Sequence, residues 1–236
     1  FEAADRFTIT GGNTCGLLSS MLQRKQPITI YGPPGTRQIV EGLAMACDIP
    51  QAIGFGVVGQ SLPHPRNFVQ VEEIAPGDTF EIDNIRVSCC ENTHYRAETE
   101  LGTKGPISLS LRFDAPDRSI VYTGDTGPCR MVENLAKGAQ LLVGEMMLAE
   151  QIIAQLQEKN PHMTSERITM MGQHLHSHHL SPEQLGDLAA RAGVAHVVAV
   201  HIPLDSITPE TAPDFTARIS RVFSGQVSIA NDLDQF

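Results

Sequence analysis

Three side chains that commonly bind metal ions each follow an apolar segment that predicts a β-strand: His94, Asp125 and His201. Strand ends can meet at one edge of a layered sheet although they are distant in sequence. Imidazole and carboxylate groups without a thiolate suit Zn²⁺, Mn²⁺ or Fe ions that keep a position open for water. Such an ion lowers the pKa of that water and supplies metal-bound hydroxide near neutral pH, which predicts hydrolytic chemistry. For a single histidine at a strand end, a hydrogen-bonded loop residue is the simpler interpretation than a metal ligand. Three strand ends in the order His, Asp, His favour a metal site instead.

The turn that carries Asp125 follows the short apolar run from Ile120 to Tyr122 and the turn residue Gly124. A carboxylate at the end of a buried strand is a common place for chemistry in α/β folds, although an Asp here could also cap the next helix. The tripeptide from Asp125 to Gly127 also matches the aspartic protease motif. That chemistry needs two such carboxylates, and the sequence has one copy, so we reject it.

The elements that must position these residues alternate between strand and helix patterns, which predicts an α/β fold with hairpins early and β-α units late. No repeat, low-complexity tract or linker suggests a boundary, so we predict a single domain over residues 1–236. The predicted strands are 7–10, 27–31, 68–73, 79–82, 85–90, 107–113, 120–122, 139–143, 194–200 and 226–229. The predicted helices are 16–23, 37–47, 131–136, 149–159, 182–192 and 208–222, and residues 50–67 read as a loop.

The GPPGT stretch from Gly32 to Thr36 invites a nucleotide-binding interpretation. A phosphate loop needs a glycine and a lysine where this sequence has Arg37 and Gln38. We therefore predict an ordinary turn between a strand and a helix.

Composition limits the partners and the compartment. The chain has 236 residues and a net charge of −10, so overall electrostatics do not favour nucleic acid, and a small-molecule substrate is the expected partner. Its five cysteines fit no zinc ribbon or disulfide framework, which indicates reduced thiols and a cytoplasmic protein. No apolar run is long enough to cross a membrane. The sequence begins at Phe1, and we expect an N-terminal part, including the first strands of the fold, to lie outside it.

Five histidines gather between residues 160 and 180: His162, His174, His176, His178 and His179. A run of this kind can bind metal adventitiously, but for His174 and His176 we favour a solvated loop. His178 and His179 directly precede the helix that Ser181 and Pro182 open, so either could point into a cleft.

The chain resembles the metallo-β-lactamase superfamily, most closely its ribonuclease Z-like branch. The matching segments, in order, are ITIYGPPGT at 28–36, NTH at 92–94, VYTGDT at 121–126, LLVGE at 141–145, HLSPEQ at 179–184 and VAVH at 198–201. The resemblance implies a four-layer αβ/βα sandwich with a two-metal site at one edge, Zn²⁺ being the expected ion.

The resemblance also implies a role for each site residue. His94 would bind the first metal, Asp125 would bridge the two ions, and His201 would bind the second. Glu145 and His179 would transfer protons. The family is often dimeric, so a homodimer is one possibility, and the sequence leaves the oligomeric state open.

The main ligand motif of that family, His-x-His-x-Asp-His, has no counterpart in this sequence. It should follow the strand at 7–10, where only Gly11, Gly12 and Asn13 stand. A natural loss of metals, an engineered deletion, or missing residues would each explain this. With His94, Asp125 and His201 alone, a single weak metal site is plausible and a two-metal site is not.

Function follows from the resemblance as an expectation. We expect a metal-dependent hydrolase of a small-molecule ester, lactone or lactam-type bond. One alternative is a ribonuclease Z-like phosphodiesterase that acts on tRNA 3′ ends. Another is a non-catalytic family member without metal.

Overall fold

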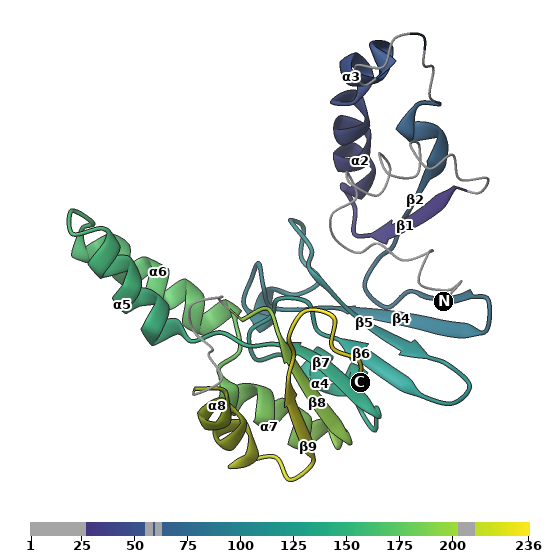
Figure 1. The fold of residues 1–236 in the computed structure, drawn as a ribbon. Helices are drawn as coiled ribbons and strands as arrows, with labels where there is room; N and C mark the ends of the chain where they lie inside the picture. Colours follow the sequence, from purple (N-terminus) through teal and green to yellow (C-terminus); the bar gives the residue numbers. More distant parts are fainter. Residues whose placement is uncertain (1–26, 55–58, 60–62, 203–210) are drawn as a thin grey trace. The chain divides into compact units, whose positions relative to one another are not determined.

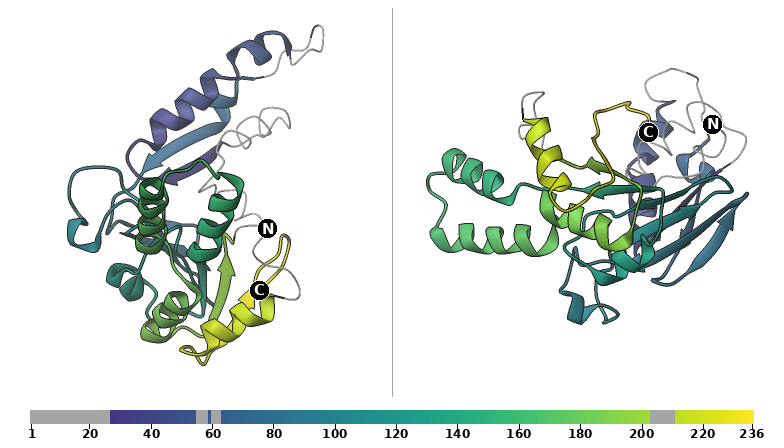
Figure 2. Two further views of the ribbon diagram at one scale, coloured as in Figure 1. Left: turned by 90° about the vertical axis from the view of Figure 1, so that its left-hand side faces the viewer. Right: turned by 90° about the horizontal axis from the view of Figure 1, so that it is seen from below.

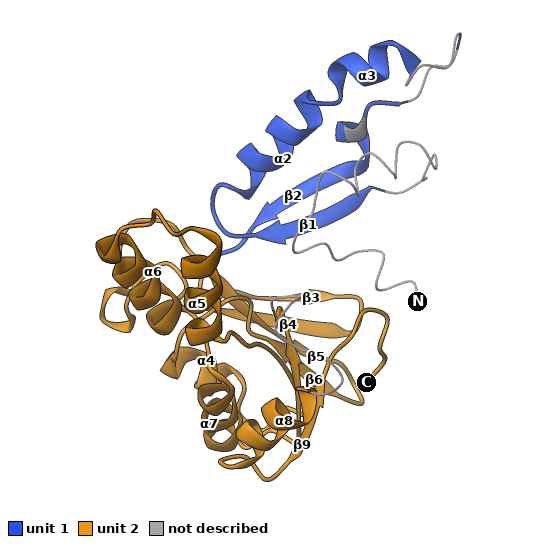
Figure 3. Cartoon of the chain, turned by 60° about the vertical axis from the view of Figure 1, so that its left-hand side comes forward, with its two compact units in different colours: residues 1–75 blue, residues 76–236 orange. Residues whose placement is uncertain are grey.

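A computed structural model describes residues 27–54, 59, 63–202 and 211–236. The chain divides into two compact units, residues 1–75 and 76–236, which are described separately below (Figure 3). The predicted strand at 7–10, the helix at 16–23 and the segment from Gly11 to Asn13 lie outside the described residues. The prediction of a single domain stays a prediction.

The first unit contains a parallel β-α-β arrangement. Strand β1 (Ile28–Gly32) pairs in parallel with β2 (Val69–Glu73), and helix α2 (Thr36–Met45) connects them together with α3 (Asp48–Ala52) and the 3-10 turn η3 (Pro65–Phe68). The strands and α2 were predicted. The loop predicted at 50–67 is wrong at both of its ends, where α3 and η3 form.

The GPPGT turn holds a carboxylate of the chain itself. The backbone N–H groups of Gly35 and Arg37 donate to Glu73 Oε1 at 2.8 and 3.1 Å. These two hydrogen bonds, that of Arg37 first, lower the pKa of Glu73. Since free N–H groups at a helix start attract anions, Glu73 occupies the place where a phosphate would bind. The prediction of a turn without a nucleotide site is consistent with this contact.

Among the described residues of the second unit, seven strands form one mixed sheet in the order of the sequence, from β3 to β9 (Figure 1). Pairing is antiparallel from β3 to β6 and parallel from β6 to β9. This confirms the expected hairpins early and β-α units late. The strands are β3 (Thr79–Ile82), β4 (Ile85–Glu91), β5 (Leu109–Asp114), β6 (Ser119–Tyr122), β7 (Leu141–Glu145), β8 (His196–Val200) and β9 (Gln226–Ile229).

Three helices cover one face of this sheet: α4 (Arg130–Leu135), α7 (Pro182–Ala192) and α8 (Ala212–Ser220) (Figure 3). Their apolar sides and the strands bury one hydrophobic core that includes Leu142, Leu185 and Ile219, none of which is exposed. Helix α7 follows its prediction closely. Ser181 caps it through a capping box with Gln184, and Gly193 ends it in the left-handed conformation.

Helices α5 (Ala149–Lys159) and α6 (Ser165–His178) pack side by side and extend away from the sheet (Figures 1 and 2). The loop predicted for His174 and His176 is therefore wrong, because both lie in α6. The helical pattern was overlooked because of the histidines. Ile168, Met171 and Leu175 recur at helical spacing and share the partly buried side of α6. Thr164 accepts a hydrogen bond from the N–H of Arg167 and caps its start.

In the part of the chain that the structure describes, none of the helices combines the length and the apolar character that crossing a membrane requires.

Candidate functional site

The candidate residues meet at one edge of the seven-stranded sheet because four strands end there. Strand β4 is antiparallel to β5, and β5 is antiparallel to β6, so β4 runs in the same direction as β6, β7 and β8. His94 follows the end of β4, Asp125 follows β6, Glu145 ends β7 and His201 follows β8. Chain direction alone thus brings residues that are far apart in sequence to the same edge.

Buried polar side chains fasten these strand ends together. Asn92 donates from Nδ2 to Ser110 Oγ and to the Thr123 carbonyl, both at 3.1 Å, and its Oδ1 accepts from the N–H of His94 at 3.1 Å. It therefore connects the ends of β4 and β6 with β5 between them. Asn92 is 1% exposed, so these hydrogen bonds lie away from water, where an unmade bond costs most.

A second set of contacts connects β4, β6 and β7. Thr126 Oγ1 accepts from the N–H of Thr93 at 3.3 Å, and the N–H of Thr126 donates to Glu145 Oε1 at 3.2 Å. The N–H of Glu145 donates in turn to Thr123 Oγ1 at 3.2 Å. All of these residues are buried, so the strand ends form a fixed base for the side chains that lie above them.

His94, Asp125 and His179 form a group that could hold a metal ion, since their ligand atoms all lie within 4.8 Å of one another. His201 joins this group through Asp125, with 3.4 Å between Nε2 and Oδ2. The backbone of His201 adopts a positive φ of 55°, a conformation that non-glycine residues seldom keep without a structural reason. The edge thus presents three imidazoles around one carboxylate.

Glu145 orients His179 from beneath. Its Oε1 accepts from Nδ1 of His179 at 3.1 Å and from the N–H of Leu180 at 3.1 Å, and both side chains of the pair are buried. Because the carboxylate accepts at Nδ1, the neutral ring keeps its Nε2 lone pair for another partner. Burial lowers the pKa of His179, but the hydrogen bond and charge of Glu145 and the charge of Asp125 outweigh burial, so the net shift is upward.

Helix α6 brings two more imidazoles to this edge. The His174 ring centroid lies 4.8 Å from that of His178, 5.9 Å from that of His179 and 6.3 Å from that of His94. Partial burial, and then the neighbouring imidazoles, lower the pKa of His174. The close approach of α6 depends on Gly127, where any side chain would overlap the Ser177 carbonyl.

The chemistry of this donor set fits a divalent ion. Imidazole nitrogens and a carboxylate are ligands for Zn²⁺ and for Mn²⁺ or Fe. The contact between His179 and Glu145 matches the arrangement in which a ligating histidine donates its other N–H to a carboxylate. Glu145 Oε2 is also buried and accepts no hydrogen bond from the described residues, so the site holds an acceptor that the described protein does not satisfy.

A cavity of about 470 Å³ lies between the 93–100 segment and the end of α6, where Thr93 and His178, the chain neighbours of His94 and His179, line it. Its charged lining residues are Arg96, Glu98 and Glu100. The Arg96 guanidinium is already engaged, because it donates to Thr103 and to the Pro106 carbonyl and pairs with Glu91. The two glutamates therefore leave this cavity with acidic walls.

The structure thus brings together His94, Asp125, His179 and Glu145, and His201 contacts Asp125. The metal and proton-transfer roles of these residues stay predictions. Sequence reasoning missed the fastening role of Asn92 and Thr126 and the presence of His174 at the site. The spacing of His174 and His178, one helical turn apart, was the signal that would have placed both on one face.

The comparisons with known proteins concern the family and the fold of the chain. The profile of a family described as "Beta-lactamase superfamily domain" matches residues 14–202. Ribonuclease Z of Mycobacterium sp. (strain KMS) is 29% identical over 210 residues, which are 88% of this chain and 65% of that protein. This chain therefore spans about two thirds of the length of that relative.

Solved structures show the same fold. The metallo-beta-lactamase fold protein YhfI from Bacillus subtilis matches with a TM-score of 0.56 at 14% identity, over 93% of this chain and 68% of that one. Zn(2+)-bound PqqB from Methylobacterium extorquens matches with a TM-score of 0.52 at 15% identity, over 91% and 67%.

Proposed function

Because the chain belongs to the metallo-β-lactamase superfamily, we propose that it hydrolyses an ester, lactone or lactam-type bond of a small molecule with the help of Zn²⁺. The observation that carries this proposal is the group of His94, Asp125 and His179, whose ligand atoms lie within 4.8 Å of one another. Membership of the superfamily indicates a metal-dependent hydrolase. The substrate class and the identity of the ion are what we propose.

His94, Asp125 and His179 would hold the ion, with His201 beside Asp125. When bound, Zn²⁺ lowers the pKa of water to near neutrality and polarises the bond to be cleaved. Mn²⁺ or Fe could take the same ligands. The complete fold is expected to be a four-layer αβ/βα sandwich, and in it Asp125 and His201 would help to hold the metal.

Glu145 has two tasks in this proposal. It accepts a hydrogen bond from Nδ1–H of His179 and so directs Nε2 of that ring towards the edge. Its buried position also keeps the negative charge close to His179, which stabilises the ring when it carries a proton. His179 is thereby suited either to bind the ion or to pass a proton to the leaving group, and Glu145 supports both roles.

The acidic wall of the cavity between the 93–100 segment and the end of α6 supports a substrate of low negative charge. Glu98 and Glu100 line it, whereas the Arg96 guanidinium donates to the Thr103 carbonyl of its own loop. A phosphodiester chain would meet repulsion there, and the chain as a whole carries a net charge of −10. A neutral ester or lactone would not.

The second candidate function is a ribonuclease Z-like phosphodiesterase, and the mycobacterial relative supports it through 29% identity over most of this chain. The third is a non-catalytic family member. It is supported by Gly11, Gly12 and Asn13, which stand where the family carries its main ligand motif.

Hydrolysis assays on four chromogenic or fluorescent substrates would separate these functions. The panel is a p-nitrophenyl ester, a γ-lactone, a cephalosporin and bis(p-nitrophenyl) phosphate, each with Zn²⁺ or Mn²⁺ added, alongside a precursor tRNA. We expect turnover of an ester, lactone or lactam that chelator removes. Turnover of the phosphodiester or the tRNA alone would establish the second function, and no metal-dependent turnover of any substrate would favour the third.

A matched pair of variants ties the activity to the site. Asp125→Asn removes the charge at nearly constant shape and should lower kcat/KM at least about 100-fold, the low end of what a positioned catalytic group contributes. Asp117→Asn makes the same change in the exposed turn between β5 and β6 and should leave the rate unchanged. Full activity of Asp125→Asn would refute the assignment of the site.

A further inference from the structure

Four imidazoles gather at the sheet edge, and two of them come from α6. His174 and His178 lie one helical turn apart on that helix, so both rings face the end of β4. His94 and His179 complete the set. The fold does not require polar side chains on this part of α6, since a helix can pack on the Gly127 turn through apolar residues.

The distances between the rings suit shared coordination of one ion. With a Zn–N bond of about 2.0–2.1 Å, two imidazoles bound to one tetrahedral ion have ring centroids roughly 5 Å apart, and about 6.4 Å is reached only when the two bonds lie in line. His94, His174 and His179 have pairwise centroid distances of 5.1, 5.9 and 6.3 Å. The His94–His179 pair already has the tetrahedral spacing, whereas the exposed His174 ring has to move roughly 1 Å closer to the other two.

The hydrogen bonds around the rings leave the correct nitrogen free. His179 presents Nδ1 to Glu145, and His178 presents Nδ1 to the Thr93 carbonyl at 2.7 Å. His94 presents Nδ1 to the His178 carbonyl at 3.4 Å. A carbonyl or carboxylate oxygen can only accept, so Nδ1 carries the proton in each ring and Nε2 keeps its lone pair. This is the arrangement that outer partners impose on metal-binding histidines.

We propose that His174 is a further ligand of the ion at this edge, and that it joins His94, His179 and Asp125 in a three-histidine, one-carboxylate set. Nitrogen and oxygen ligands of this number suit a tetrahedral Zn²⁺. His174 is exposed and lies outside the group whose ligand atoms approach within 4.8 Å, so its ring turns towards Asp125 when the ion binds. His178 packs against the His174 ring and limits where that ring can turn.

This inference rests on the metal site of the proposed function but not on any substrate. Co²⁺ is the probe, because it replaces Zn²⁺ and its visible absorption reports the number of ligands. The protein is titrated with Co²⁺ alone, and Zn²⁺ affinity is measured by competition with a chromogenic chelator. Neither readout depends on turnover.

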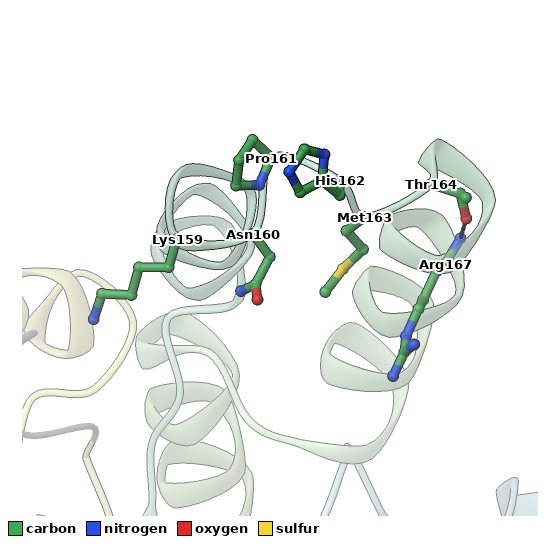
Figure 4. Close-up of a pocket in the computed structure, with 7 residues that line it drawn as sticks. All are labelled: Lys159, Asn160, Pro161, His162, Met163, Thr164 and Arg167. Carbon is green, nitrogen blue, oxygen red and sulfur yellow. Dashed lines mark hydrogen bonds between the residues drawn. The ribbon is translucent and has the colours of Figure 1, made fainter.

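The test compares His174→Ala with His162→Ala. His162 is also an exposed histidine of the α5–α6 hairpin, but it lies at the tip, next to Pro161 and across from Thr164 and Arg167 (Figure 4). Because both positions are exposed, both variants should fold, which far-UV circular dichroism checks. We expect His174→Ala to weaken Co²⁺ and Zn²⁺ binding at least 10–100-fold, roughly the loss that removal of an outer partner already causes. The Co²⁺ absorption should also change in intensity, and His162→Ala should match the wild type.

Two results would overturn the inference, and they differ in what they say of the proposed function. If His174→Ala binds both ions as the wild type does while His94→Ala loses them, His174 is not a ligand and the metal-dependent hydrolase stands. If the wild-type chain binds neither ion, both proposals fail. If His174→Ala loses metal as expected but the wild type cleaves no substrate, the metal site stands and the hydrolase does not.

Discussion

Replacing Arg96 by methionine should destabilise the second unit strongly, because its guanidinium is buried and neutralises a buried carboxylate. Nε of Arg96 lies 3.4 Å from Glu91 Oε1, and the two side chains are 8% and 3% exposed. The guanidinium also donates to the carbonyls of Thr103 and Pro106. Glu91 Oε2 accepts from the N–H of Gly102 at 2.7 Å. The pair therefore holds the whole 96–106 loop against the end of β4.

The magnitude follows from the charge that the substitution leaves behind. Methionine fills part of the space of the arginine stem, but Glu91 then keeps a buried charge without its cation. Breaking a buried pair in this way costs about 3–5 kcal/mol. For a unit of this size, 1 kcal/mol lowers Tm by roughly 2–4 °C, so Tm should fall by about 6–20 °C.

Thermal and urea unfolding followed by circular dichroism measures this loss, with Arg191→Met as the control. Arg191 pairs with Glu133 at 3.1 Å, but its side chain is 59% exposed, so the same substitution should cost at most about 1 kcal/mol. The double variant Glu91→Gln, Arg96→Met adds a second check. It removes the stranded charge while the amide oxygen can still accept from Gly102, so it should be more stable than Arg96→Met alone.

The reasoning would be refuted if Arg96→Met unfolded within about 1 kcal/mol of the wild type, or no more easily than Arg191→Met. A double variant less stable than Arg96→Met would also contradict it, because the cost would then not come from the unpaired carboxylate of Glu91.

Three further predictions concern local features of the second unit. Ser181→Ala removes the cap of α7 and should cost about 1 kcal/mol in urea unfolding, whereas Ser181→Asp should keep most of the stability; equal losses would contradict the cap. Gly127→Ala should cost about 1–3 kcal/mol because its methyl group would overlap the Ser177 carbonyl, and an unchanged Tm would show that α6 does not lie so close. Burial, and next the nearby Cys129, raise the pKa of the Cys90 thiol. At pH 8 iodoacetamide should therefore label Cys90 only in the unfolded protein, which peptide mass spectrometry measures. Labelling of Cys90 in the native protein would contradict its burial.

Patterns that act over a few residues were readable from the sequence. Ser181, Pro182 and Gly193 bounded α7 correctly, because capping and the left-handed helix end depend on neighbouring backbone groups. The apolar runs gave the strands and placed His94, Asp125 and His201 after their ends. The loop expected around His174 failed because the polar composition was weighed above the helical spacing of Ile168, Met171 and Leu175.

The sequence by itself therefore determined the strands, helices such as α7, the α/β class and the residue types at the strand ends, but not α3 or α6. Only the tertiary structure decided which of these residues meet. Strand β4 shares its direction with β6 only because β5 is interposed, and the side chains of Asn92 and Glu145 bridge residues that no local pattern connects. The approach of α6, and with it the arrival of His174 beside His94 and His179, depends on the missing side chain of Gly127. Convergence of this kind is a property of packing in three dimensions, which local periodicity does not encode.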